Sequence, residues 1–243
     1  MKKTALLGLA GLFAAGVAGA APVDVTSNIT GSVTWTSDNV YHLKDVIYVE
    51  PGATLTIEAG TKVVGYDAAE LGQADSSALV VTRGAQIFAN GTADAPIVMT
   101  SNHDDGTWRP ANSEWGNLTI LGDAIIAEAT NTGGATAGSQ DGTCWDNMEG
   151  LGTTAFSEYG GNDDMDSSGV VKYVSLRYGG SVVGPADELN GLSLGGIGCE
   201  TVFDHIEIMN NVDDGIEIWG GMPQLKDVWI WNRGADGSNI AQG

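Results

Sequence analysis

The sequence predicts an all-β fold, a right-handed parallel β-helix in which one short strand-and-turn unit stacks on the next. Three observations predict it. The 243 residues include 36 Gly without the three-residue period of collagen. Short segments alternate apolar and polar residues, which is typical of half-buried strands. Related segments recur at spacings of 22 to 32 residues without helical periodicity. Crossovers between parallel strands give the coil its right hand.

The chain begins with a predicted signal peptide, residues 1–20. A basic start at Lys2 and Lys3 precedes an apolar run that ends in the small-x-small cleavage site Ala18-Gly19-Ala20. A membrane anchor is the alternative, but the run is short for a span and Pro22 follows it. We therefore expect an exported protein at the cell surface, outside the cell or in the periplasm, with no transmembrane segment and one domain at 21–243.

The first repeat in this domain pairs VEPGATLTIEAGT (49–61) with VTRGAQIFANGT (81–92) at a spacing of 32 residues. Matching positions of successive units lie above one another in a solenoid. Short parallel strands are predicted within residues 49–64, 79–100, 115–121 and 170–240.

A second repeat relates KYVSLRYGG (172–180), DHIEIMNNVDDG (204–215) and KDVWIWNRGADG (226–237). We expect Asn210 and Asn232 to stack at a turn, and Gly215 and Gly237 to adopt a backbone angle that other residues resist. The predicted inward columns are Val174–Ile206–Val228 and Leu176–Ile208–Ile230.

Insertions at 66–78 and 181–190 and a long Gly- and acid-rich excursion at 127–169 interrupt the units. Cys144 and Cys199 would meet an oxidising compartment, so we expect a disulfide that pins the excursion to the 191–199 unit; two buried thiols are the alternative. No capping element follows the last unit, so further units, another domain or another subunit are expected to cover that end.

The stretches GATLTIEAGT, WGNLTILGDA, DDMDSSGVVKYVSLRYGG, ELNGLSLGGIG and NNVDDGIEIWGG together resemble a widespread group of secreted bacterial proteins with right-handed parallel β-helix repeats. The resemblance extends over residues 30–243. It implies the fold of pectate lyases and other polysaccharide-active β-helices. The group is mostly of unassigned function, so the resemblance implies no particular reaction.

Composition and motifs exclude several functions. The formal net charge of −21 leaves no basic patch for nucleic acid or for an anionic membrane surface. No zinc-ligand spacing or phosphate loop is present. Residues 191–195 match G-x-S-x-G, but Ser193 aligns with the outward Glu217 of the next unit and no helix follows, which argues against a serine hydrolase.

The segment DMDSSG suggests an optional calcium site at Asp163, Asp164, Asp166 and Ser168, because hard cations are bound by several oxygens from one tight turn. The alternative is an Asp-rich turn that caps the next strand. No other cofactor is expected.

A second acidic group consists of Asp213, Asp214 and Asp236, with Arg233 nearby. Paired carboxylates could act as acid and base or bind a metal ion. Their recurrence in successive units favours a capping role at the turn, and they remain weak catalytic candidates.

The outward positions of the stacked strands give the main ligand-binding candidates: Arg177, Glu207, Trp219, Trp229 and Trp231. Exposed indoles beside carboxylates are typical of sugar-stacking or protein-binding surfaces. Alternatively, the excursion covers these indoles as a second core. We expect a binding, adhesion or structural module for a polysaccharide or a surface protein; a lyase or glycoside hydrolase of the same fold is the alternative.

Overall fold

The computed structural model describes residues 20–127, 129, 144–184 and 187–242. The predicted signal peptide lies outside the described residues apart from Ala20. Within the described part of the chain, no helix is long and apolar enough to cross a membrane.

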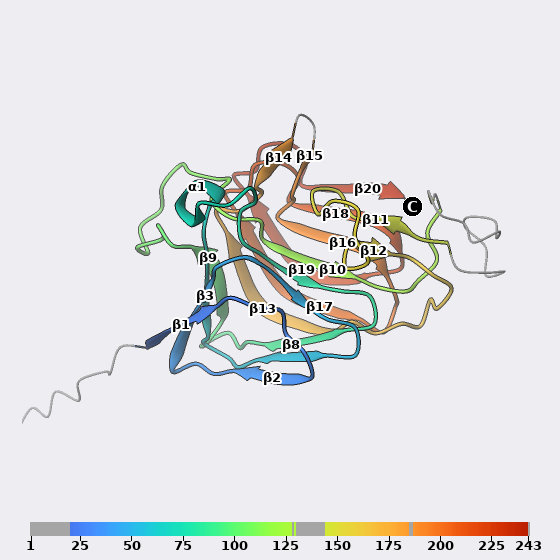
Figure 1. Ribbon diagram of the computed structural model, residues 1–243, viewed down its shortest axis with the longest axis horizontal. Coiled ribbons are helices and arrows are strands. Elements are labelled where there is room, and N and C mark those ends of the chain that lie inside the picture. Colours follow the sequence, from blue (N-terminus) through green and yellow to red (C-terminus); the bar gives the residue numbers. More distant parts are fainter. Residues whose placement is uncertain (1–19, 128, 130–143, 185–186, 243) are drawn as a thin grey trace, which may run out of the picture.

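The predicted parallel β-helix is confirmed. A ten-stranded sheet divides into two ladders that meet in β13 (Gly169–Arg177), since the first half of β13 pairs with β8 and the second half with β9. The strands coil from blue to red in Figure 1. The first ladder contains β1 (Ala21–Val25), β3 (Asn39–Leu43), β6 (Lys62–Gly65) and β9 (Ile97–Ser101), and the second contains β2 (Ser32–Trp35), β5 (Thr54–Ile57) and β8 (Gln86–Asn90).

Both ladders continue from β13 into the long strands β17 (Val202–Met209) and β19 (Gln224–Trp231). A third ladder of six parallel strands closes the coil. It contains β4 (Val46–Val49), β7 (Ala78–Val81), β10 (Leu118–Leu121), β16 (Leu192–Ile197), β18 (Ile216–Gly221) and β20 (Ser238–Gln242). Strands such as TLTI in β5 alternate half-buried and buried side chains, as their period-2 sequence predicts.

The inward columns predicted from the repeats are confirmed by the strand register. Val174 pairs with Ile206 and Ile206 with Val228, and Leu176, Ile208 and Ile230 form the next column. The members from β13 and β17 are about 1% exposed, whereas those from β19 are half-buried. The apolar interior of the coil is therefore continuous through these units.

The turn chemistry differs from the prediction for the glycines. Asn210 and Asn232 stack as expected, and the Asn232 side-chain amide donates to Asn210 Oδ1 over 2.6 Å. These asparagines, not Gly215 and Gly237, adopt positive φ, at 58° and 55°. Gly215 is needed for space instead, because a Cβ there would lie 2.6 Å from the carbonyl oxygen of Gly237.

The two insertions form small independent elements. The first carries the one-turn helix α1 (Ala68–Leu71), whose N-terminus is capped by Asp67. The second carries the antiparallel strands β14 (Val182–Gly184) and β15 (Asp187–Glu188).

The described part of the long excursion packs on the outer face of the third ladder. It contains the antiparallel pair β11 (Asp146–Asn147) and β12 (Glu158–Tyr159). A second apolar cluster forms there, against which Trp219 is partly buried. The cluster consists of Ala78, Val80, Leu121, Ile126, Met148, Leu151, Tyr159 and Leu189.

The predicted Cys144–Cys199 disulfide is wrong for this structure, because no disulfide joins the two residues. Cys144 is buried, whereas Cys199 Sγ lies 3.4 Å from Met165 Sδ on another turn. Backbone hydrogen bonds attach the excursion instead, from Gly160 N to Gly122 O at 2.9 Å and from Cys199 N to Asp164 O at 2.9 Å.

Candidate ligand-binding face

The candidate site lies on the outer side of the second halves of β13, β17 and β19. Ser175, Glu207 and Trp229 are aligned across these strands, and so are Arg177, Met209 and Trp231. Because residues at every second strand position share a face, the backbone presents these side chains side by side.

The indoles on this face are open to solvent. Trp229 is 73% exposed and Trp231 is 42% exposed. The alternative, in which the excursion covers the indoles, is therefore wrong for Trp229 and Trp231. It holds for Trp219, which lies on β18 in the third ladder and contacts the second apolar cluster, so Trp219 is not part of this face.

Arg177 connects the acidic groups of the face. Its Nε donates to Ser175 Oγ at 2.7 Å and its Nη2 lies 3.3 Å from Glu207 Oε2. Its Nη1 lies 4.0 Å from Asp104 Oδ2. Ser175 also donates to Glu207. The guanidinium charge is thus shared by two carboxylates, and Arg177 is a poor partner for an anionic ligand.

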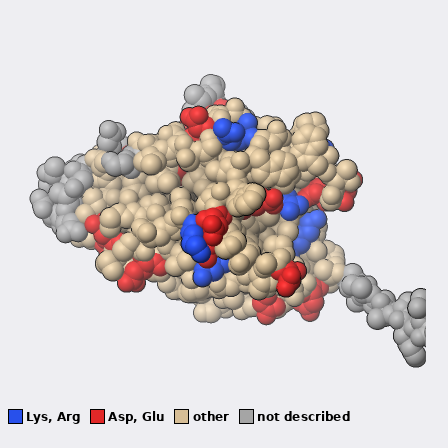
Figure 2. Space-filling model, turned by 180° about the vertical axis from the view of Figure 1, so that it is seen from behind, with Lys and Arg blue, Asp and Glu red and all other residues tan. Residues whose placement is uncertain are grey.

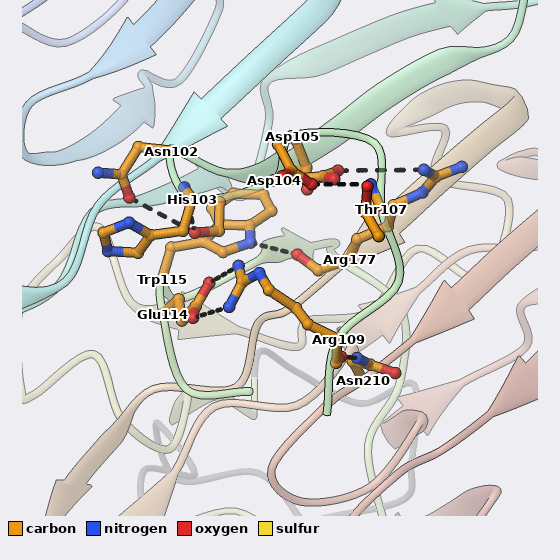
Figure 3. Close-up of polar contacts among 12 residues, drawn as sticks. Asn102, His103, Asp104, Asp105, Thr107, Arg109, Glu114, Trp115, Arg177 and Asn210 are labelled. Atoms are coloured by element: carbon orange, nitrogen blue, oxygen red, sulfur yellow. Dashed lines mark hydrogen bonds and ion pairs between the residues drawn. The ribbon is translucent and has the colours of Figure 1, made fainter. Parts of the chain in front are cut away.

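A loop between β9 and β10 lies beside Arg177 and Asn210, as Figure 3 shows. Asp104 accepts from Thr100 Oγ1 at 2.7 Å and from the backbone N–H of Gly106 at 2.9 Å. Burial alone would raise the pKa of Asp104, but these hydrogen bonds, together with the charges of Lys62 and Arg177, outweigh burial and lower it.

The far end of this loop is fixed to the stacked pair Asn210 and Asn232. Arg109 forms a two-pronged ion pair with Glu114, and its guanidinium lies 4.3 Å from the centre of the Tyr178 ring. The side-chain amide of Asn210 donates to Arg109 O at 2.5 Å, and Trp108 Nε1 donates to Asn210 Oδ1 at 3.3 Å. Trp108 is 53% exposed and adds a third indole at the margin of the face.

A shallow pocket of about 210 Å³ lies beside Trp229. It is lined by His205, Ile206, Glu207, Asp227 and Trp229. A ligand that stacks on the Trp229 ring can therefore reach carboxylate and imidazole groups at the ring's edge.

His205 is held between two carboxylates at the edge of this pocket. Its Nδ1 lies 2.7 Å from Asp204 Oδ1 and its Nε2 lies 3.7 Å from Asp227 Oδ2, while its ring stacks on Tyr173 at 4.2 Å. Asp204, His205 and Asp227 are close enough to share a metal ion. Lys226 Nζ, however, lies 3.5 Å from a carboxylate oxygen of each aspartate and already supplies a positive charge.

Among the weak catalytic candidates at the other corner of the coil, Asp214 caps the turn of the next unit. Asp214 is 5% exposed, and its Oδ1 accepts from the backbone N–H of Asp236 at 2.6 Å. Burial and the neighbouring carboxylates of Asp214 and Glu188 raise the pKa of Asp213. Within the described part of the chain, no carboxylate lies within ion-pair distance of Arg233, so no acid–base arrangement with Arg233 is evident.

The calcium candidates bind separate backbone groups. Asp163 Oδ1 accepts from Met165 N at 3.0 Å, Asp164 Oδ1 from Ile125 N at 3.1 Å and Asp166 Oδ2 from Asp123 N at 3.2 Å. Ser168 is buried, and its N–H donates to Thr201 Oγ1. Two groups of described residues converge closely enough for a metal ion, and neither contains these four residues.

Sequence reasoning missed Asp104, Trp108 and the pair His205–Asp227. A signal for the loop was available, since residues 103–109 combine two acids, a tryptophan and an arginine between two predicted strands. For His205 the sequence shows only the adjacent Asp204, because Asp227 and Tyr173 reach the imidazole from neighbouring coils.

Three stacked parallel ladders with a polar, indole-bearing outer face define a parallel β-helix protein. Residues 27–243 match the family model described as the pectate-lyase-like beta helix domain, and the chain belongs to that family. A search of curated proteins and a search of solved structures each gave no match.

Proposed function

We propose that the protein is an exported binding module that holds a polysaccharide against the outer face of β13, β17 and β19. The observation that carries the proposal is Trp229, which is 73% exposed on β19 and lies beside Glu207 of the neighbouring strand β17. Glu207 in turn pairs with Arg177 of β13. Exposing so large an apolar side chain is costly unless a ligand covers it, and flat indoles stack on sugar rings.

The charge of the face favours a neutral ligand. Arg177 is already paired with Glu207 and lies near Asp104, and Lys226 lies between Asp204 and Asp227. In the view of Figure 2, basic side chains likewise lie beside acidic ones without forming a separate basic patch. With a formal net charge of −21, the chain repels a polyanion unless a cation bridges the two.

The double variant Trp229→Ala, Trp231→Ala tests this proposal on a glycan array and by titration calorimetry with any glycan that binds. We expect the affinity for the glycan to fall at least about tenfold, because stacking of a sugar ring on an exposed indole contributes about 1 kcal/mol or more per indole. The melting temperature should change little, since both rings are exposed. Met222→Ala, at a 46% exposed position between β18 and β19, is the control that should bind normally.

Unchanged glycan binding by the double variant would contradict the proposal. So would a large loss of stability, because it would place the indoles in the core.

An enzyme that cleaves polysaccharide is the second candidate. One observation favours it: Glu207, His205 and Asp227 line the pocket beside Trp229 and include groups able to donate or accept protons. Assays for new reducing ends and for unsaturated uronates would distinguish the two functions. Our proposal expects binding without turnover, and chain cleavage by purified protein would support the enzyme.

A further inference from the structure

A second hollow, of about 410 Å³, lies apart from the ligand-binding face, where the excursion meets the coil. Arg83 and Gly84 from the β7–β8 turn, Asp123 after β10, Trp145 before β11 and Asp166 before β13 line it. Its volume is within the usual range for small-molecule sites. Neither the candidate face nor the capping turns make use of this hollow.

The charges around the hollow do not cancel. Arg83 is committed to the excursion, since its Nη2 lies 2.9 Å from Glu158 Oε2 and its Nη1 donates to Gly160 O at 2.6 Å. Arg83 Nη1 also lies 4.0 Å from Asp123 Oδ1. Within the described part of the chain, this is the only ion pair that either carboxylate lining the hollow, Asp123 or Asp166, forms. Asp166 accepts a hydrogen bond from the backbone N–H of Asp123, which brings no countercharge. The hollow is therefore electronegative.

The carboxylates of Asp123 and Asp166 in this hollow are also partly buried. Burial raises the pKa of Asp123, and the nearby Asp166 and Asp163 charges raise it further, against the lowering effect of Arg83. Burial and the Asp163 charge likewise raise the pKa of Asp166. A cation that enters the hollow would stabilise both ionised carboxylates.

The indole of Trp145 favours an organic cation over a metal ion in this hollow. A hard metal ion is bound by six to eight oxygen ligands, and an indole offers none. An indole wall beside carboxylates instead suits an organic cation, through cation–π attraction, or a sugar ring whose hydroxyls bond to the acids.

We propose that this hollow binds a ligand that carries a protonated amine on a hydroxylated ring, the chemistry of a glucosamine unit. The ring lies against Trp145, and the ammonium group lies between Asp123 and Asp166. The proposal goes beyond the binding face, because it uses different residues and a charged ligand class.

The test is titration calorimetry at about pH 6 with the glucosamine trimer and with its fully N-acetylated counterpart, which has the same ring skeleton without the charge. We expect the amine form to bind at least about tenfold more tightly, as the loss of a charge-assisted hydrogen bond implies. Binding of the amine form should weaken as salt is added.

Three variants make the test specific to the hollow. Asp166→Asn and Trp145→Ala should each weaken binding of the glucosamine trimer about tenfold or more. Asp94→Asn removes one negative charge from an exposed turn between β8 and β9 and should leave binding unchanged. Melting curves establish that each variant is folded.

Equal affinity for the two trimers would overturn the proposal, because a neutral sugar would then suffice. Binding of Ca²⁺ but not of the amine would overturn it in favour of a metal site. Unchanged binding by folded Asp166→Asn and Trp145→Ala would place the amine elsewhere. None of these outcomes bears on Trp229 and Trp231, so failure here is distinguishable from failure of the proposed function.

Discussion

Arg177 illustrates how single residues shape this surface. Its guanidinium is within ion-pair distance of Asp104 and Glu207 and donates to Ser175, so it attaches two acidic side chains, from the β9–β10 loop and from β17, to β13. The alternation of the strand predicts that Arg177 and Glu207 face outward. It could not predict Asp104, because the loop that carries Asp104 reaches the face only after folding.

The residue scale also gives a prediction for pH dependence at the second hollow. The pKa of Asp123 is raised in the folded protein, so the folded state binds its proton more readily than the unfolded chain does. The contribution of Asp123 to stability therefore falls as pH rises through this raised pKa.

At about pH 7 the free energy of unfolding of Asp123→Asn should accordingly exceed that of the wild type. The gain should be less than about 1 kcal/mol, because solvent screens the partly exposed carboxylate. The advantage should shrink below the ordinary aspartate pKa of about 3.9, where both states are protonated. Denaturant unfolding at the two pH values measures it. An advantage that grows on acidification would contradict the assigned cause.

Individual strands followed their sequence closely, whereas the turns did so in part, since Asn210 and Asn232 stack as predicted but Gly215 and Gly237 lack the predicted positive φ. The period-2 pattern predicted β5, β8, β13, β17 and β19 and the register among the last three, because each inward side chain must meet its counterpart one coil away. The prediction of a Cys144–Cys199 disulfide was wrong because the presence of two cysteines in the sequence does not reveal how far apart they lie in the fold. The path of the excursion, which decides that distance, is set by backbone contacts that leave no pattern in the sequence.

The glycine column provides a matched test at the scale of the turn. A methyl group added at Gly215 would lie 2.3 Å from Ile230 Cγ2, whereas at Gly237 the nearest atom, Arg233 Nε, would be 3.6 Å away. Gly215→Ala should cost about 1–3 kcal/mol through overpacking, and Gly237→Ala should cost little. Chemical denaturation measures both, and equal costs would show that the close contact between coils is not what requires Gly215.

At the scale of the whole molecule, three parallel ladders place two surfaces with different chemistry on one acidic coil. The first ladder presents exposed indoles among paired charges, and the junction of coil and excursion holds an electronegative hollow. The fold class was predictable because repetition amplifies a weak local pattern. The position of the binding face was partly predictable, since Trp219 occupies an outward position like that of Trp229 but lies under the excursion.

The central claim is that ligand contacts the outer face of β13, β17 and β19. Hydroxyl-radical footprinting, read residue by residue with mass spectrometry, measures this directly in the wild-type protein with and without a bound neutral glycan. The account predicts strong protection of Trp229 and Trp231, with Met222 and Met165 labelled equally in both states. Binding that leaves the labelling of Trp229 and Trp231 unchanged would contradict it.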